Sequence, residues 1–231
     1  MHLRAIMVAS MCGSLLACPA VPVVQVVGPI RDLGDGEPLA GVQVCLLEGD
    51  LCVETDGNGD YHFDGVEGQR DIRLTLDFPG YVRGLVPIKL LDSDHQVAPV
   101  SLGSDLLTEL QAGLLGLPAE PETGQIVFSV SNGIPGDGLN HPDVRLGLMP
   151  AAGEGPFYTA VGGLPDREEL ATTDHGGGVL VNVAPGNYRL VHESLPPNCH
   201  LVLGWSEPPE VRVPVQADRV TYSRIECPVT P

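Results

Sequence analysis

The sequence predicts an all-β protein built from two tandem antiparallel β-sandwiches that are joined by a short helical and Pro-rich linker. Three observations carry this prediction. The 231 residues include 29 glycines and 22 prolines, a composition typical of many short strands joined by turns. Apolar residues make up 43% of the chain, enough to form a core, and they alternate with polar residues in several stretches. One stretch of the pattern recurs later in the chain.

The clearest strands lie near the front of the chain. Apolar and polar residues alternate from Val42 to Leu46, and the turn residues Glu48-Gly49-Asp50 separate this run from the next. A second turn, rich in Gly, Asn and Asp, then leads into Tyr61 and Phe63, which share one face of a strand. Short alternating runs bounded by such turns are typical of antiparallel strands.

This segment resembles the carboxypeptidase regulatory-like domain, a prealbumin-like sandwich related to Cna-B-type domains. The resemblance rests on Pro38-Leu-Ala-Gly-Val-Gln-Val44, on Thr55-Asp-Gly-Asn-Gly-Asp-Tyr-His-Phe63, on Val66 and on Gly80-Tyr81. It implies an accessory sandwich at residues 24–102 and excludes the zinc-bearing catalytic domain of carboxypeptidases. Such sandwiches occur in receptors, adhesins, transporters and enzymes, so the resemblance implies a fold and no specific activity.

A repeat predicts the second sandwich, at residues 124–231. Four positions of the first segment recur with a constant offset of 117 residues: Thr55, Gly59, Phe63 and Val66 correspond to Thr172, Gly176, Leu180 and Val183. Val144-Arg-Leu-Gly-Leu148 also mirrors the alternation of Val42 to Leu46. Between these two parts, residues 149–166 are expected to form a Gly- and Pro-rich insertion that exposes Phe157 and Tyr158. The alternative is that Gly-rich turns resemble one another by chance.

The segment 103–123 is predicted to be a linker with a short helix. Ser104 is a suitable N-cap, and Pro118 ends the helical pattern. The leucines of this segment keep roughly one face, so we expect the helix to pack on a sandwich or between the two: Leu106, Leu107, Leu110, Leu114 and Leu117.

The N-terminus predicts export. Arg4 precedes an apolar run that is too short to span a bilayer, and small residues follow it, which is typical of a secretory signal at residues 1–17. Leu15-Leu-Ala-Cys18 resembles a bacterial lipobox, which implies that Cys18 becomes the acylated, palmitate-bearing N-terminus of a lipoprotein. Residues 18–23 would then be the lipidated tether, and Pro19 after the cysteine favours the outer membrane. The alternative is an ordinary signal peptide, cut nearer Ala20.

Four cysteines remain after the predicted signal and the lipidated residue. Disulfides are the default in an oxidising compartment, and four cysteines allow three pairings. The local pairing is the simplest: Cys45 with Cys52, and Cys199 with Cys227. A metal site would need Cys-x-x-Cys or closely spaced Cys and His, and the sequence has neither.

Composition and motifs exclude several classes of function. The formal net charge is −18, so the chain repels phosphate backbones and nucleic acid is not expected as a partner. The sequence contains no His-x-x-Glu, no Gly-x-Ser-x-Gly and no Gly-rich phosphate loop. We therefore predict a protein that is not an enzyme and that needs no cofactor.

Two binding hypotheses remain. Asp56, Asn58 and Asp60 alternate like calcium ligands, but Asp, Asn and Gly are also what a tight strand connection requires, and we prefer that interpretation. Trp205 could stack on a sugar, as in starch-binding domains of similar fold, with Phe157-Tyr158 as a second patch. A lone tryptophan is more often partly buried.

The sequence as a whole predicts a non-catalytic lipoprotein of the cell envelope whose sandwiches act as an adaptor or assembly module for a protein partner. The alternative is a carbohydrate-binding module of the envelope. In both cases the membrane is contacted through the lipid anchor.

Overall fold

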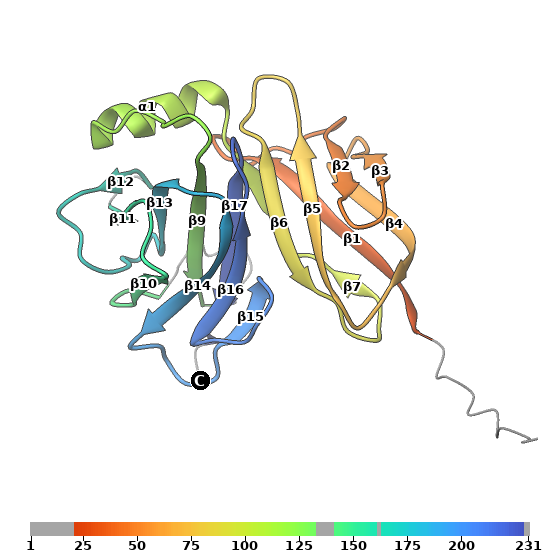
Figure 1. Ribbon diagram of the computed structural model, residues 1–231. Coiled ribbons are helices and arrows are strands. Elements are labelled where there is room, and N and C mark those ends of the chain that lie inside the picture. Colours follow the sequence, from red (N-terminus) through yellow and green to blue (C-terminus); the bar gives the residue numbers. More distant parts are fainter. Residues whose placement is uncertain (1–20, 133–140, 161–162, 229–231) are drawn as a thin grey trace, which may run out of the picture.

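The computed structural model describes residues 21–132, 141–160 and 163–228. It confirms the all-β class and the two tandem sandwiches, with one helix between them (Figure 1). The predicted signal and residues 18–20 of the tether, Cys18 included, lie outside the described residues. Within those residues, no helix has the length and apolar character needed to cross a membrane.

The first sandwich consists of two sheets. One contains β1 (Val23–Asp32), β4 (Asp60–Glu67), β7 (His95–Gln96) and β8 (Val100–Leu102). The other contains β2 (Gln43–Leu46), β3 (Leu51–Glu54), β5 (Asp71–Asp77) and β6 (Gly84–Lys89). The alternation predicted for β4 places Tyr61, Phe63 and Val66 in the core between the two sheets.

The second sandwich follows the same plan. One sheet contains β10 (Arg145–Met149), β14 (Gly186–Glu193) and β16 (Glu210–Val215). The facing strands are β9 (Gly124–Ser131), β11 (Glu154–Thr159), β12 (Pro165–Asp166), β13 (Gly177–Val183), β15 (His200–Leu203) and β17 (Val220–Glu226). The expected insertion at residues 149–166 is therefore partly regular, because β11 and β12 extend the sheet beyond β13.

The predicted repeat has a structural counterpart in the pairing of strands. Val26 of β1 lies opposite Phe63 of β4, and Ile126 of β9 lies opposite Leu180 of β13. All four side chains are buried. On its other side β1 pairs with β8 in parallel, as β9 pairs with β17. The two sandwiches thus share the arrangement of their central strands.

The turn before β4 explains one of the repeated glycines. Gly59 has a φ of +78°, and a Cβ at this position would lie 2.5 Å from the carbonyl oxygen of Ile30. Its amide donates to Asp56 O and its carbonyl accepts from Ile30 N, and Gly176 makes the corresponding bonds with Thr173 and Val130. Only glycine combines this backbone conformation with this close approach.

The two sandwiches are joined by one continuous sheet (Figure 1). β6 of the first pairs in parallel with β17 of the second, with Gly84 opposite Val220 and Leu85 opposite Thr221. Leu203, at the end of β15, belongs to the buried core of the first sandwich. The second sandwich therefore supplies both a strand and an apolar side chain to the first.

Helix α1 (Asp105–Leu115) is capped at its N-terminus as predicted, because the Ser104 hydroxyl accepts a hydrogen bond from Leu107 N. It ends at Leu115, two residues before the end that Pro118 suggests, and its C-cap Gly116 has a φ of 60°. The helix contacts both sandwiches, since Asp105 N donates to Gly80 O of the first and Arg167 of the second donates to Leu115 O. The predicted leucine face does not make these contacts. Leu115 is buried, whereas Leu106, Leu110 and Leu114 are exposed.

Both predicted disulfides are present. Cys45 and Cys52 join the adjacent strands β2 and β3 at the edge of the first sandwich. Cys199 and Cys227 join the segment before β15 to the residue after β17 in the second. Each bridge lies within one sandwich, so the contact between the sandwiches depends on strand pairing and side chains.

Candidate functional site

The junction between the sandwiches contains Trp205. This residue follows β15 and is half-buried. Its indole N–H donates a hydrogen bond of 3.1 Å to the carbonyl oxygen of Ile72 in β5. The neighbouring Gly204 amide donates to Pro87 O of β6 over 2.9 Å. The residue singled out as a sugar-binding candidate thus ties the second sandwich to the first.

Arg219 is a second residue of the junction. Its guanidinium donates to Gly84 O (3.0 Å) and to Asp77 Oδ2 (3.1 Å), both in the first sandwich. Asp77 also accepts from Arg83 over 2.7 Å. Burial alone would raise the pKa of Asp77, but the hydrogen bonds from Arg83 and Arg219 outweigh it and lower this pKa below its usual value. The carboxylate is therefore held in its charged form.

Two further ion pairs cross the same junction nearer the solvent. Arg212 Nη2 lies 3.0 Å from Asp71 Oδ2, and Lys89 Nζ lies 3.9 Å from Glu207 Oε1. Both pairs are substantially exposed, so each contributes little to stability by itself. Together with the contacts of Trp205 and Arg219, they make the junction between the two sandwiches partly polar.

A cleft of about 450 Å³ lies at the junction, beside the helix. We call it the junction cleft. Its walls come from both sandwiches and from α1, and they include Val100 of β8, Thr108 and Gln111 of α1, Val127 of β9, Val179 of β13 and Tyr222 of β17. Burial raises the pKa of Tyr222, so its hydroxyl stays protonated. The size and the mostly apolar lining are those of a site for an apolar side chain or a small apolar group.

A second hollow, of about 470 Å³, lies between β10 and β11. These strands belong to opposite sheets, so the hollow marks an open side of the second sandwich. Phe157 and Arg167 line it together with Arg145, Glu169 and Glu193. The Arg167 guanidinium carbon lies 5.5 Å from the centre of the Phe157 ring, so one face of the ring already carries a cation.

Tyr158 is not part of an exposed aromatic patch, contrary to expectation. It is buried, and its ring packs edge-on against Phe128, with 5.8 Å between the ring centres. Its hydroxyl oxygen accepts a hydrogen bond of 2.8 Å from Leu146 N, which links β11 to β10. Adjacent residues of a strand point to opposite faces, so Phe157 alone of this pair is available to a ligand.

The calcium candidates form a tight turn. One carboxylate oxygen of Asp56 accepts hydrogen bonds from Asn58 N (2.8 Å) and Asp60 N (3.0 Å). These two backbone bonds, the one from Asp60 first, lower the pKa of Asp56. One of the two carboxylate oxygens of Asp56 thus holds the turn, the structural role that the sequence favours for this segment.

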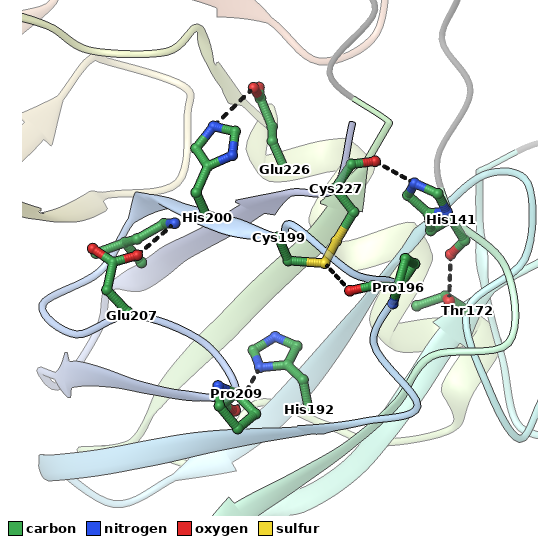
Figure 2. Close-up of a disulfide and its surroundings, with 11 residues drawn as sticks. His141, Thr172, His192, Pro196, Cys199, His200, Glu207, Pro209, Glu226 and Cys227 are labelled. Atoms are coloured by element: carbon green, nitrogen blue, oxygen red, sulfur yellow. Dashed lines mark hydrogen bonds and ion pairs between the residues drawn. A yellow bond between two sulfur atoms is a disulfide. The ribbon is translucent and has the colours of Figure 1, made fainter. Parts of the chain in front are cut away.

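Three histidines surround the Cys199–Cys227 disulfide, and Figure 2 shows that their rings point to different partners. His141 contacts Cys227 O, His192 Nδ1 lies 3.3 Å from Pro209 O, and His200 Nε2 lies 3.7 Å from Glu226. Across the described ranges, no group of three His, Cys, Asp or Glu side chains is placed to hold a metal ion.

The role of Arg219 and the exposure of the α1 leucines were not predicted from the sequence. Arg219 directly precedes β17, and nothing in the sequence indicates that Asp77 and Gly84 lie beside it. The leucines of α1 did carry a signal, since residues at i, i+4 and i+8 share one face of a helix. That signal reveals an apolar face but not whether the protein covers it.

No protein-family model and no curated protein matches this sequence. Among solved structures, the TIE protein of Bacillus anthracis is 10% identical, with a TM-score of 0.30 over 90% of this chain. The chain spans only 35% of that protein. The minor pilin GBS52 of Streptococcus agalactiae is 13% identical, with a TM-score of 0.28 over 90% of this chain and 98% of the pilin. Similarities this low reveal nothing about what this chain binds.

Proposed function

We propose that the chain is a non-catalytic adaptor of the cell envelope, which holds two β-sandwiches as one rigid body and presents them to a protein partner. One observation carries the proposal: the sandwiches share a continuous sheet through β6 and β17. Leu203 of the second sandwich also lies in the core of the first. Contacts between domains that can move are usually more polar and share no core.

Rigidity matters for such an adaptor because it lowers the entropic cost of binding. A partner that touches both sandwiches need not order them first, so more of the contact energy appears as affinity. The part-buried hydrogen bonds of Trp205 and Arg219 would hold the sandwiches in one relative orientation, which a flexible linker would leave free.

Anchoring at the envelope is the second part of the proposal. Two disulfides are features of proteins that fold in an oxidising compartment outside the cytosol. Acylation of Cys18 would place the lipid five residues before the first residue of β1. Such a short tether would keep the first sandwich near the membrane surface. Labelling with a palmitate analogue, compared between the natural chain and Cys18→Ser, tests this step.

The adaptor role is tested by cross-linking in intact cells. The chain has a single lysine, Lys89, so amine-reactive reagents would sample only the junction, and photo-leucine is the better choice. Cells that produce a tagged chain are grown with photo-leucine, irradiated and lysed, and the adducts are identified by mass spectrometry. One dominant polypeptide supports the proposal. The absence of any protein adduct, or adducts with glycan alone, contradicts it and favours the carbohydrate-binding alternative.

Two variants test whether the partner requires a fixed orientation of the sandwiches. Arg219→Gln removes a mostly buried contact across the junction, whereas Arg83→Gln removes an exposed contact to the same Asp77. The first variant is expected to reduce capture of the partner and the second to leave it unchanged. Equal capture by both variants would show that the partner does not need a fixed orientation.

A further inference from the structure

Helix α1 carries an exposed row of leucines. Leu106, Leu110 and Leu114, which we call the leucine stripe, are 77%, 54% and 54% exposed. They lie at positions i, i+4 and i+8 of the helix, so their side chains form one continuous apolar face. Leu115 on the opposite side is buried against the protein. Single exposed leucines are ordinary, but a contiguous row of three on one helix is typical of an interaction surface.

The helix that presents this stripe is fixed at both ends. At its N-terminus, Asp105 N donates to Gly80 O of the first sandwich over 3.0 Å. At its C-terminus, Arg167 of the second sandwich donates from Nε (2.8 Å) and from Nη2 to Leu115 O. A cation at this position also interacts favourably with the helix dipole. The helix therefore bridges the two sandwiches, and its outer face is presented in one orientation.

The surroundings of the stripe specify the chemistry of its partner. Glu109 is exposed one turn after Leu106, Glu120 and Glu122 are exposed in the segment that follows the helix, and residues 105–124 contain no lysine or arginine. The nearby cations are already engaged: Arg167 by Leu115 O and the Phe157 ring, and Arg83 and Arg219, which line a hollow with Asp105, by Asp77. On the inner side of the stripe, Gln111 lies one turn from Leu114 and lines the junction cleft. An apolar strip bordered by carboxylates and by an apolar cleft is complementary to an apolar surface that is bordered by lysine or arginine.

We propose that the leucine stripe, together with the adjoining junction cleft, is the docking surface for a protein partner that offers an apolar groove bordered by basic side chains. The partner's groove covers Leu106, Leu110 and Leu114, and one of its apolar side chains enters the cleft beside Gln111. This inference rests on the adaptor role proposed above, and it names the surface and the partner's chemistry.

The charges and the position of α1 disfavour two other occupants. A second copy of the chain would bring a further formal charge of −18 and the same carboxylates against Asp105 and Glu109. A membrane surface is favoured by basic residues on the polar face of a helix, which α1 lacks. In Figure 1, α1 also lies at the opposite end of the molecule from the start of β1, where the tether would attach.

The test places a photoreactive residue in the stripe and at a matched site. The two variants are Leu110→p-benzoylphenylalanine and Leu91→p-benzoylphenylalanine, because Leu110 is 54% and Leu91 is 56% exposed. Each full-length chain is irradiated in the cells that produce it, and the cross-linked peptides are sequenced by mass spectrometry. We expect one polypeptide to be cross-linked to position 110 and not to position 91. The cross-linked peptide of that partner should be apolar and flanked by lysine or arginine.

The affinity of that purified polypeptide is then measured. Leu106→Gln, Leu110→Gln and Leu114→Gln combined are expected to weaken binding roughly a hundredfold or more, because truncating a central apolar contact costs about tenfold or more. Leu91→Gln should leave the affinity unchanged. Asp105→Asn with Glu109→Gln should weaken binding less, and should reduce its dependence on salt.

Several outcomes overturn the inference. Adducts with a second copy of the chain, adducts with lipid, no adduct at position 110, or equal adducts at positions 110 and 91 each contradict it. If photo-leucine captures a partner but position 110 does not, the adaptor role stands and this docking surface is wrong. If neither captures a polypeptide, both proposals fail.

Discussion

Thr55 and Thr172 make the same three hydrogen bonds in the two sandwiches. The Thr55 hydroxyl donates to Leu39 O (2.6 Å) and accepts from Val42 N (2.9 Å), and the Thr55 amide donates to Val42 O. The Thr172 hydroxyl donates to His141 O (2.6 Å) and accepts from Val144 N (3.0 Å), and its amide donates to Val144 O. Both side chains are buried, so each hydroxyl replaces water as the partner of two backbone groups.

Replacing either threonine by valine should therefore lower the stability of the protein. Thr55→Val leaves the amide of Val42 and the carbonyl of Leu39 without this partner, which we expect to lower the free energy of unfolding by about 1–3 kcal/mol. Thr172→Val should behave alike. Thr55→Ser is the control, since it keeps the hydroxyl and loses one methyl group, at a cost of about 0.8 kcal/mol. Urea unfolding measures all three, and a serine variant less stable than the valine variant would contradict this role.

The junction should unfold together with both sandwiches. Arg219, whose side chain is 10% exposed, and Arg83, whose side chain is 54% exposed, bind the same carboxylate of Asp77. Arg219→Gln is expected to cost about 1–3 kcal/mol, and Arg83→Gln about 0–1 kcal/mol. The natural chain should show one unfolding transition in calorimetry. Two separate transitions in the natural chain would contradict a rigid pair of sandwiches.

Trp205 provides an optical test of the same junction. As the single tryptophan, it reports only on its own surroundings. Because its N–H donates to Ile72 O across the junction, we expect its fluorescence to change when the sandwiches separate in denaturant. Added polysaccharide should leave the spectrum unchanged. A saturable spectral shift with a glycan would instead restore Trp205 as a sugar-binding residue.

The two disulfides should differ in what they contribute. They close loops with sequence separations of 28 residues for Cys199–Cys227 and 7 residues for Cys45–Cys52. The chain-entropy model assigns them about 3.6 and about 2.4 kcal/mol, respectively. We expect Cys199→Ala with Cys227→Ala to lower stability more than Cys45→Ala with Cys52→Ala. Denaturant unfolding of the two double variants checks the order, and a reversed order would mean that the entropy of the unfolded chain does not dominate.

Stability should also depend on pH through His192. Burial lowers the pKa of this side chain, although hydrogen bonds with Pro209 and Leu190 partly oppose the shift. The unfolded chain therefore takes up the proton first, at the ordinary histidine pKa of about 6.5. Stability is fully present above that pH and is lost as the pH falls toward the lower pKa of the folded form.

His192→Gln should reduce this loss of stability below about pH 6.5. Burial also lowers the pKa of His95, so part of the dependence should persist in the variant. Unfolding free energies measured from pH 5 to pH 8 give the result, and an unchanged slope in His192→Gln would show that this histidine is not responsible.

Local patterns in the sequence predicted the hairpin of β2 and β3 with its Cys45–Cys52 bridge, the turn before β4 and the helix cap, because each depends on residues close together in the chain. The alternation at Tyr61 and Phe63, the glycine at position 59 and the N-cap at Ser104 all appear as predicted. Even the repeat could be found, since Thr55 and Thr172 perform the same local task.

The roles of residues that contact distant segments could not be predicted from the sequence, because they depend on the tertiary structure. Trp205 and Arg219 act at the junction only because β17 pairs with β6, which lies more than 130 residues away in the sequence. Tyr158 is a core residue because β11 pairs with β13 at the end of the sheet. The leucines of α1 were predicted to be buried, because an apolar helix face usually packs on the nearest core. Arg167 and Gly80 hold the helix so that this face is turned to solvent, and no local pattern encodes that orientation.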